Sequence, residues 1–518
     1  MKTTKFITTI LSVAMLFQAC TADFEEINTN PNQLTVGQIQ AIGMFEPLLY
    51  DGANQWLERT WFWNNELMQF TVFSGGTTRE EHRYFISDGN FSNWWNFNAD
   101  YANNAMHMYE LAEQENNAAL KAIALTWKVL YLSNQTDIFG DIPYSEAFQA
   151  RSTGNVKPKF DSQKEVYEQM FTELEQANTL YAEAKNLTEP GRDKMYEGDI
   201  LKWRKFNNSL YLRLLMRVSG RSEMNSASKI QTIANNPDQY PVFTSNADNA
   251  TVKFTGESPY VNYFGSTTES NFTTAGRHLA EQTINMMVLT NTSNETLVDP
   301  RLPIIGKTNN SSNSWKGAVS GGTIEETSSS NSGASLLNFE VFCRDNATYT
   351  FMDYAEVRFI LAEAALKGMI SGGTATSKMH YEAGITASMQ KWSELGTFSV
   401  TPTTISEAQI TAFLQFQGVQ FDANSSVSNL TELIANQKHV ALFWIGFEAW
   451  HEYRRTGYPE LTIGAGTLND HILPTRFAYP SVTMATNSEH ANAALANMGG
   501  PNDMKTPLWW SKQAINQN

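Results

Sequence analysis

The fold is indicated most clearly by Asn436-Gln-Lys-His-Val-Ala-Leu-Phe-Trp-Ile-Gly-Phe-Glu-Ala-Trp-His-Glu-Tyr-Arg-Arg-Thr-Gly-Tyr-Pro-Glu-Leu461. Apolar side chains recur here at helical spacing, and they predict a helix over Asn429 to Tyr453 that is buried on much of its surface. Two arginines fall in its last turn, where the helix dipole favours cations. Gly457 can take the left-handed conformation of a helix end, and Pro459 cannot continue a helix, so the pattern predicts where this helix stops.

The composition narrows the class of ligand. The chain has 518 residues, of which 42% are hydrophobic, and a net charge of −16. Loss of the first nineteen residues would remove two lysines and no acid, which gives 35 − 53 = −18. Such a charge disfavours nucleic acid and anionic membrane surfaces as partners. Charged residues make up only 17% and aromatic residues 12%, a mixture that suits stacking on neutral polar ligands.

The N-terminus is typical of a targeting segment. Lys2 and Lys5 precede an apolar run that ends at Phe17 and is too short to span a bilayer. Gln18-Ala19-Cys20 then resembles a bacterial lipobox, in which Cys20 becomes the lipidated first residue. We therefore expect a signal peptide at 1–19 and a lipidated tether at 20–35; an ordinary secretory signal cut elsewhere is the alternative.

Motifs for metals and cofactors are missing from the sequence. Cys343 is the one cysteine left after Cys20, so no disulfide or cysteine-based metal site is expected. His451-Glu452 lacks the second histidine of a zinc protease, because Arg455 stands there. No catalytic residue, metal or cofactor is predicted, and a structural calcium ion is left open.

Helical patterns dominate the first part of the chain. They run from about Val36 to Asn134, where Asn134 to Asp137 are expected to end a helix that covers Lys121 to Tyr131. The apolar pattern predicts a helix that begins after Asp161 and includes Val166 to Tyr181, and a further helix over Trp203 to Arg221 that pairs with it. This helix pair resembles the antiparallel pairs of tetratricopeptide units, which stack because one pair cannot bury its apolar face alone.

The helical pattern fades between Asn235 and Asp345. Across Lys307 to Ser335, 20 of 29 residues are Ser, Thr, Asn or Gly, and this long loop contains Trp315. Loops of this length are either functional or disordered. Helix returns at Tyr354 to Leu366.

Two motifs resemble a known family. They are Glu448-Ala449-Trp450 followed by Arg454-Arg455-Thr456-Gly457-Tyr458-Pro459, and the turn Asp137-Ile-Phe-Gly-Asp-Ile-Pro-Tyr144. As a pair they are similar to the signatures of SusD/RagB-like surface lipoproteins of Bacteroidetes-type bacteria. The resemblance implies a mainly α fold, with a tetratricopeptide-like helix-pair scaffold and a loop-rich, irregular second half.

The same resemblance implies the domain organisation. Residues 36–518 would form a single domain, with the helical scaffold mainly at 36–230 and 350–395. The loop-rich ligand and packing region would cover 235–345 and 396–518.

The resemblance also implies a function. The protein would capture an oligosaccharide or oligopeptide and deliver it to a SusC-like TonB-dependent outer-membrane transporter, without catalysis. It would be anchored at the outer membrane through its lipid and exposed at the cell surface. A surface glycoside hydrolase and a structural or adhesive helical-repeat lipoprotein are the alternatives.

Candidate ligand contacts combine aromatic rings with planar polar groups. Sugar rings present apolar C–H faces to aromatic planes and hydroxyls to amides, and helix packing is the competing interpretation for each ring. The candidates are Trp61, Trp63, Arg79, Tyr84, Trp94, Trp95, Tyr260, Tyr263 and Trp315.

Two clusters of charge have a catalytic or binding interpretation beside a structural one. Glu448 is the best single candidate for a catalytic acid, although pairing with Arg454 or Arg455 would make it structural. The basic residues between 204 and 217 either bind an anion or form a solvated helix face paired with acids.

Overall fold

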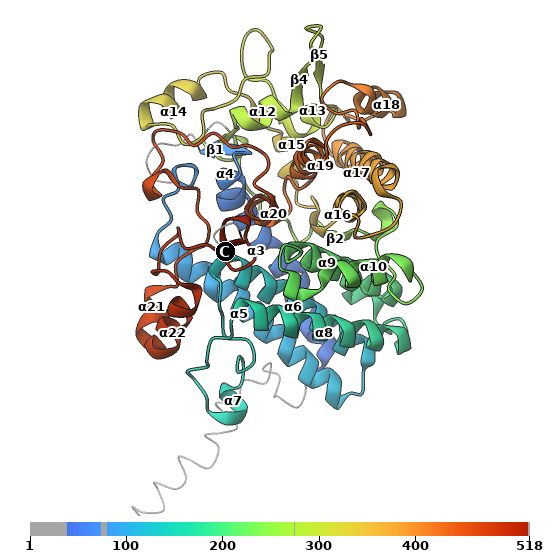
Figure 1. Cartoon of the computed structure of the whole chain (residues 1–518), viewed down its shortest axis with the longest axis vertical. Helices are drawn as coiled ribbons and strands as arrows, with labels where there is room; N and C mark the ends of the chain where they lie inside the picture. The colour runs from blue at the N-terminus through green and yellow to red at the C-terminus, as the bar shows by residue number, and fades with distance from the viewer. Residues whose placement is uncertain (1–38, 74–79, 274, 516–518) are drawn as a thin grey trace, which may run out of the picture.

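The computed structural model describes residues 39–73, 80–273 and 275–515, and it is mainly helical (Figure 1). The predictions for the signal peptide, Cys20, the tether and Arg79 lie outside the described residues. The predicted fold class is confirmed. The longer helices are α3 (Gly52–Arg59), α5 (Asp88–Gln114), α6 (Ala118–Phe139), α8 (Gln163–Glu183), α9 (Ile200–Arg217), α10 (Ser226–Asn235), α16 (Tyr354–Leu366), α17 (Gly373–Gly396), α18 (Glu407–Gln415), α19 (Val427–Ala441), α20 (Glu448–Thr456) and α22 (Ser488–Met498).

The scaffold consists of neighbouring helices that pack side by side. Helices α5, α6, α8 and α9 lie next to one another in the lower part of Figure 1, and α16, α17 and α19 form a second group above them. Helix α9 contacts α16 and so links the two groups. Most of α6 is buried on all sides, because neighbouring helices cover it.

The region between α10 and α16 has only short elements, as predicted. Four strands form an antiparallel sheet in the order β1-β3-β7-β6, and two further strand pairs are β2 with β8 and β4 with β5. The long polar loop contains one helical segment, α14 (Ile324–Asn331). The strands are β1 (Thr71–Phe73), β2 (Ala250–Val252), β3 (Arg277–Leu279), β4 (Val288–Thr290), β5 (Thr296–Val298), β6 (Gly306–Lys307), β7 (Leu336–Leu337) and β8 (Tyr349–Met352).

Helix α6 is longer than predicted, because it continues through Asn134 and ends at Gly140, where φ is +95°. The polar side chains that suggested a turn are buried and have partners. Asn134 donates to the Asn98 side chain at 2.8 Å, and Gln163 donates to the Thr136 carbonyl at 2.8 Å. Polar composition was therefore a misleading stop signal.

The single helix predicted over Asn429 to Tyr453 is wrong. The structure has two helices, α19 and α20, with a tight turn between them, in which Trp444 has φ +72° and Gly446 has φ +48°. The turn keeps the same residues buried, so the hydrophobic pattern alone did not reveal it.

Glycine is required at two positions around this motif. A Cβ atom on Gly446 would lie 3.0 Å from the Trp56 ring, in a backbone conformation that other residues rarely adopt. Gly457 has φ +81° and terminates α20, which confirms the predicted helix end.

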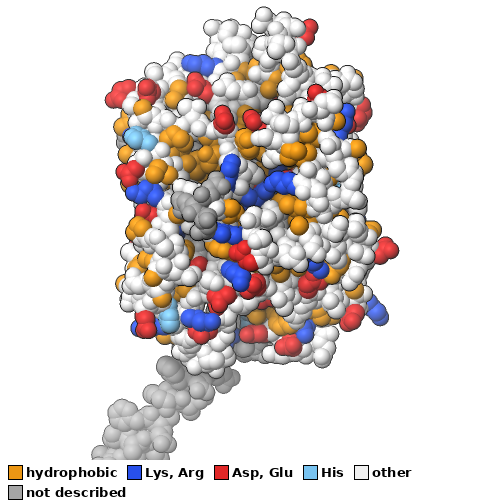
Figure 2. Space-filling model, in the orientation of Figure 1, with side chains coloured by type: hydrophobic (Ala, Val, Ile, Leu, Met, Phe, Trp, Pro, Cys, Tyr) orange, Lys and Arg blue, Asp and Glu red, His pale blue; other side chains and the backbone are white. Residues whose placement is uncertain are grey.

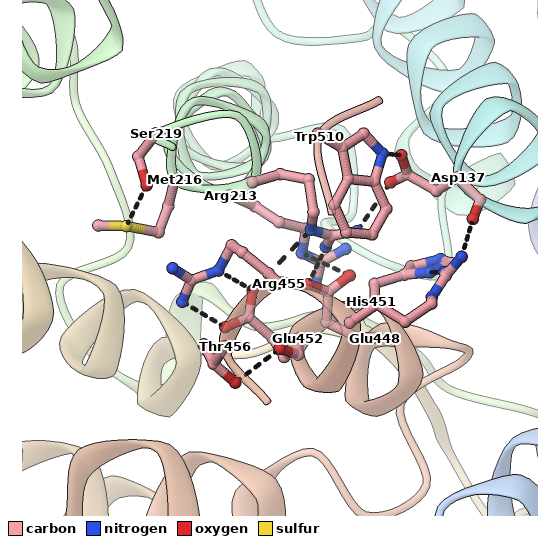
Figure 3. A network of polar contacts seen from close by, with 12 residues as sticks. Asp137, Arg213, Met216, Ser219, Glu448, His451, Glu452, Arg455, Thr456 and Trp510 are labelled. Atoms are coloured by element: carbon pink, nitrogen blue, oxygen red, sulfur yellow. Dashed lines mark hydrogen bonds and ion pairs between the residues drawn. The ribbon is translucent and has the colours of Figure 1, made fainter. Parts of the chain in front are cut away.

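Buried ion pairs join α6, α9, α16 and α20, and Figure 3 shows the part of this network around Asp137, Arg213 and Glu448. Arg217 of α9 donates to Asp137 of α6 at 2.7 Å and also pairs with Glu448 of α20. One turn earlier, Arg213 binds both carboxylate oxygens of Glu356, at 2.6 and 2.5 Å. These side chains are almost fully buried, so each charge depends on its partner.

A second set of pairs continues the network along α20. Arg455 binds both oxygens of Glu363 at 2.8 and 2.5 Å and also pairs with Glu452, which Lys438 approaches at 2.9 Å and Arg217 at 3.9 Å. Burial alone would raise the pKa of Glu363, but the charges of Arg455 and Lys367 lower it to about 2. Glu363 therefore stays ionised inside the protein.

The C-terminal tail completes this network. Trp510 donates its indole N–H to Asp137 at 2.7 Å, and Tyr167 donates to the same oxygen at 2.7 Å. Arg454 lies 3.7 Å over the Trp450 ring and donates to the backbone carbonyl of Asp137 at 2.7 Å. The C-terminal segment is therefore held against α6 by the hydrogen bond from Trp510 to Asp137.

Glu448 is structural, but the predicted partners are wrong. Its carboxylate pairs with Arg217 and lies 3.6 Å from Arg213, whereas Arg454 and Arg455 bind other groups. With 5% of its surface exposed, Glu448 is not open to a substrate from solvent.

The expectation of a solvated basic face on α9 is also wrong in part. Arg213 and Arg217 are buried in the network, while Lys205 pairs with Asp248 at 3.0 Å. Arg204 donates to the Asn178 side-chain oxygen and to the Gln239 backbone carbonyl. These four cations of α9 are therefore occupied within the protein.

Removal of the Arg217 guanidinium should destabilise the fold strongly. We expect Arg217→Met to cost about 3–5 kcal/mol, because it leaves Asp137 and Glu448 buried without their cation. Urea unfolding followed by circular dichroism measures this. The control is Lys164→Met, which removes the exposed pair with Glu168 and should cost about 1 kcal/mol or less. Equal losses for the two variants would contradict the role given to the network.

Buried His439 should make stability depend on pH below neutrality. Burial lowers its pKa to about 3, against 6.5 in an unfolded chain, so between these values the unfolded state binds a proton that the folded state does not. Stability is fully present above pH 6.5 and falls as the pH is lowered, by about 1.4 kcal/mol per pH unit for this group. We expect His439→Gln to reduce the slope of unfolding free energy against pH between 6 and 4.5 by that amount.

The control for this measurement changes the packing and keeps the titrating ring. His439 stacks on Phe70 at 4.3 Å, so Phe70→Leu should lower stability at every pH and leave the slope in place. An unchanged slope in His439→Gln would show that the ring does not titrate as described.

Candidate functional site

Three of the predicted ligand contacts are packing residues in this structure. Trp94 is fully buried, 5.5 Å from Trp63 and 4.3 Å from Phe447 between ring centres. Trp61 and Trp63 are 7% and 5% exposed. Through the contact of Trp94 with Phe447, these rings link the N-terminal helices to the turn before α20, and they expose almost no ring surface to solvent.

Tyr84 and Trp95 are also held in packing contacts. Tyr84 is 1% exposed and has φ +65°. Trp95 is half-buried, with the rings of Phe139 and Tyr479 at 5.1 and 5.7 Å. Arg79 cannot be placed, since it lies outside the described residues.

Tyr260 and Tyr263 lie together at the surface, against the first helical segments. We call this group the tyrosine platform and define it as Tyr260, Tyr263, Glu46, Asn54 and Glu58. Tyr263 is 38% exposed and Tyr260 is half-buried. Tyr263 is the most exposed of the predicted aromatic residues that the structure describes, whereas Tyr260, Trp95 and Trp315 are half-buried.

Tyr260 is oriented by one stacking contact and one hydrogen bond. Its ring lies 4.3 Å from that of Tyr50, at 28°, and its hydroxyl donates to Glu46 at 2.7 Å. The hydrogen bond to the Glu46 carboxylate raises the pKa of Tyr260, because it stabilises the neutral phenol. Tyr260 therefore remains a donor at physiological pH.

Tyr263 is fixed from both its backbone and its hydroxyl. Its N–H donates to the Asn54 side chain at 2.8 Å, and Asn54 donates in turn to the Val261 carbonyl at 3.0 Å. The hydroxyl donates to Glu58 at 2.8 Å. Asn54 and Glu58 are four residues apart on α3, so one helix edge holds the whole tyrosine segment.

Trp61 packs against the platform through the ring of Phe264. Phe264 lies 5.1 Å from Trp61 and 4.9 Å from Tyr263, between ring centres. The structure thus connects two of the predicted aromatic residues through a third ring that the sequence analysis did not select.

Trp315 lies in the polar loop and is half-buried. A Cβ atom on Gly306 would lie 3.4 Å from the Trp315 ring, but the contacts that exclude a side chain there are the Leu279 Cδ1 atom at 2.5 Å and the Leu336 carbonyl oxygen at 3.0 Å. Asn310 orders the neighbouring residues, because it donates to the Ser314 carbonyl at 2.8 Å and accepts from the Ser314 N–H at 3.1 Å. Trp315 is thus presented among hydroxyl and amide groups.

Sequence reasoning missed the polar residues of the first helical segments that complete the platform. Glu46, Asn54 and Glu58 read as ordinary surface positions of a helical pattern. Their partners lie more than 200 residues away along the chain, and no local signal joins such segments.

The surface has mixed charge. Figure 2 shows acidic and basic side chains interspersed on one face, with no large area of a single sign. Within the described ranges, no group of His, Cys, Asp and Glu is arranged to hold a metal ion. The helices described also include none that is long and apolar enough to cross a membrane.

Comparison with known proteins identifies relatives of the whole fold. A family model, SusD-like, described as starch-binding and associating with the outer membrane, matches residues 31–480. A SusD homolog from Bacteroides fragilis is 24% identical, with 91% of this chain and 99% of that chain covered and a TM-score of 0.74. A SusD homolog from Parabacteroides distasonis is 22% identical, with 92% of this chain and 98% of that chain covered and a TM-score of 0.77.

A chitin-binding SusD homolog from Flavobacterium johnsoniae is also similar, at 23% identity, with 91% of this chain and 98% of that chain covered and a TM-score of 0.71. Comparison with curated proteins gives no match. Because the family model covers most of the chain, the protein belongs to the SusD-like family of outer-membrane-associated binding proteins.

Proposed function

We propose that this protein captures an oligosaccharide at the bacterial cell surface and passes it intact to a SusC-like TonB-dependent transporter. The observation that carries the proposal is the match of the SusD-like family model over residues 31–480. A similar structure is that of a chitin-binding homolog, which supports a glycan rather than a peptide as cargo.

The tyrosine platform and Trp315 are the proposed contact sites. An exposed aromatic face can stack on the C–H face of a sugar, and nearby carboxylates and amides accept or donate hydrogen bonds to its hydroxyls. Tyr263, Glu58 and Asn54 provide these groups within one rigid cluster. Rigid side chains bind with less loss of conformational entropy.

Binding without bond cleavage is part of the proposal. The catalytic candidate Glu448 is buried and occupied by Arg217, which leaves it unsuited to protonate a glycosidic oxygen. The glycoside hydrolase alternative would need another pair of carboxylates.

Attachment by a lipid at Cys20 is proposed from the sequence. A tether concentrates the protein at the membrane that holds its transporter, so weak contacts between the two suffice. Mass spectrometry of the protein purified from membranes would detect the acyl chains.

Removal of the open aromatic rings should weaken glycan binding. We expect Tyr263→Ala and Trp315→Ala each to reduce affinity about tenfold for the oligosaccharide that binds, since each removes one stacking surface. Isothermal titration against a panel of neutral oligosaccharides and a peptide mixture measures this. Tyr109→Ala is the matched control, because this half-buried tyrosine lies on α5 outside the platform. Unchanged affinity in both site variants would refute the proposed contacts.

The bound oligosaccharide should be recovered whole. After overnight incubation with the purified protein, chromatography should show the starting chain length alone, since the fold offers Glu448 only as a structural group. Shortened products that disappear when the protein is omitted would instead favour the hydrolase alternative.

A further inference from the structure

The two residues that flank Trp315 are each held by hydrogen bonds to another polar residue. On the N-terminal side, the Asn310 side chain accepts from the Ser314 N–H at 3.1 Å and donates to the Ser314 carbonyl at 2.8 Å. On the C-terminal side, the Lys316 N–H donates to the Ser335 hydroxyl at 3.1 Å, and the Lys316 carbonyl accepts from the Ser335 N–H at 2.7 Å. The backbone is therefore fixed on both sides of the tryptophan.

Both flanks are also tied to one short segment, residues 332–335, which we call the loop base. The Asn310 side chain donates to the Gly333 carbonyl at 3.1 Å. The Lys316 ammonium group donates to the Ser332 carbonyl at 2.7 Å. Two separate sets of hydrogen bonds therefore connect the loop around the tryptophan to the same four residues.

The loop base is joined in turn to the four-stranded sheet. Ala334 and Ser335 are fully buried, and the next residue begins β7. The Ser335 carbonyl accepts from the Leu279 N–H of β3 at 2.8 Å. A loop as polar as this one has little apolar surface to bury, so these hydrogen bonds are what holds it against the fold.

Asn310 is suited to this place by its hydrogen-bonding capacity. Its two N–H groups serve the carbonyls of Ser314 and Gly333, and its oxygen accepts from the Ser314 N–H and from the Ser312 hydroxyl, the latter at 2.7 Å. An aspartate could accept the same bonds but has no N–H to give to the two carbonyls. A planar amide is thus needed to join the two segments.

We propose that Asn310 is a positioning residue for ligand binding, which holds the backbone around Trp315 so that the ring is in place before a sugar arrives. The inference rests on the proposed function, in which Trp315 is a contact, and it adds the residue that prepares this contact. A contact group that is already ordered loses less conformational entropy on binding than one that the ligand must order.

Loss of the Asn310 amide should weaken binding without abolishing it. The Trp315 ring remains in Asn310→Ala, but the ligand must then order the loop that carries it. We expect affinity to fall about threefold, which is less than the loss of about tenfold expected when the ring itself is removed. Because Asn310 is half-buried in a surface loop, the midpoint of thermal unfolding should stay within about 2 °C.

The test uses the purified full chain and isothermal titration with maltohexaose and N-acetylglucosamine hexamer. These probes follow from the family description as starch-binding and from the similar chitin-binding structure. The probe that binds more tightly is then titrated into the variants, and circular dichroism follows their thermal unfolding.

A double-mutant cycle separates positioning of the ring from a general effect on the fold. In a chain that already has Trp315→Ala, adding Asn310→Ala should cause no further loss of affinity, because no ring is left to position. In a chain that has Tyr263→Ala, the same addition should cause its full loss of about threefold, since the two sites are independent.

The matched control is Asn291→Ala in the turn of the β4–β5 hairpin. Asn291 organises its own turn through its side chain, which accepts from the N–H groups of Ser293 and Glu295 at 3.0 and 2.9 Å. It is half-buried like Asn310, and residues 290–296 include no aromatic ring. This substitution should leave affinity for the probe unchanged.

Unchanged affinity in Asn310→Ala, or an equal loss with and without the Trp315 ring, would overturn this inference and leave glycan capture standing. Unchanged affinity in Trp315→Ala would overturn it as well, because the contact that Asn310 prepares would not exist. If neither probe nor any member of the neutral panel binds, the proposed function falls together with the inference.

Discussion

The fold depends on the pairing of charges inside it. Arg217 is enclosed between Asp137 and Glu448, so three helices that are far apart in the sequence must come together before any of these groups can be buried. Such pairs add little net stability compared with apolar packing, but they strongly penalise arrangements in which one partner is missing. They therefore specify how α6, α9 and α20 meet.

The helical scaffold could be predicted from the sequence because its signals are local. Spacing of apolar residues located the long helices, and Gly457 with Pro459 located the end of α20. The turn at Trp444 and Gly446 could not be predicted, since a sharp reversal between two buried helices keeps the apolar pattern continuous. The extension of α6 was missed for a related reason: the partners of Asn134 and Thr136 come from other helices.

Less of the candidate site could be predicted. The sequence indicated aromatic residues as a class, but burial depends on the fold, and Trp63 and Trp94 are enclosed while Tyr263 remains open. The residues that orient Tyr263 come from α3, more than 200 positions earlier. The interpretation of Glu448 as structural was correct in kind, although its partners belong to α9 and could not be inferred from neighbours on its own helix.

The contact between Trp510 and Asp137 has a consequence for how the chain matures. Asp137 accepts its indole hydrogen bond from a residue 373 positions later, near the end of the polypeptide. During synthesis the helical layers can begin to pack, but this carboxylate lacks that donor until nearly the whole chain has emerged. In fragments that stop short of residue 510, Tyr167 and Arg217 could still donate to the two oxygens of this carboxylate, but the indole that closes the site would be missing, so the final packing of α6 waits for the end of translation.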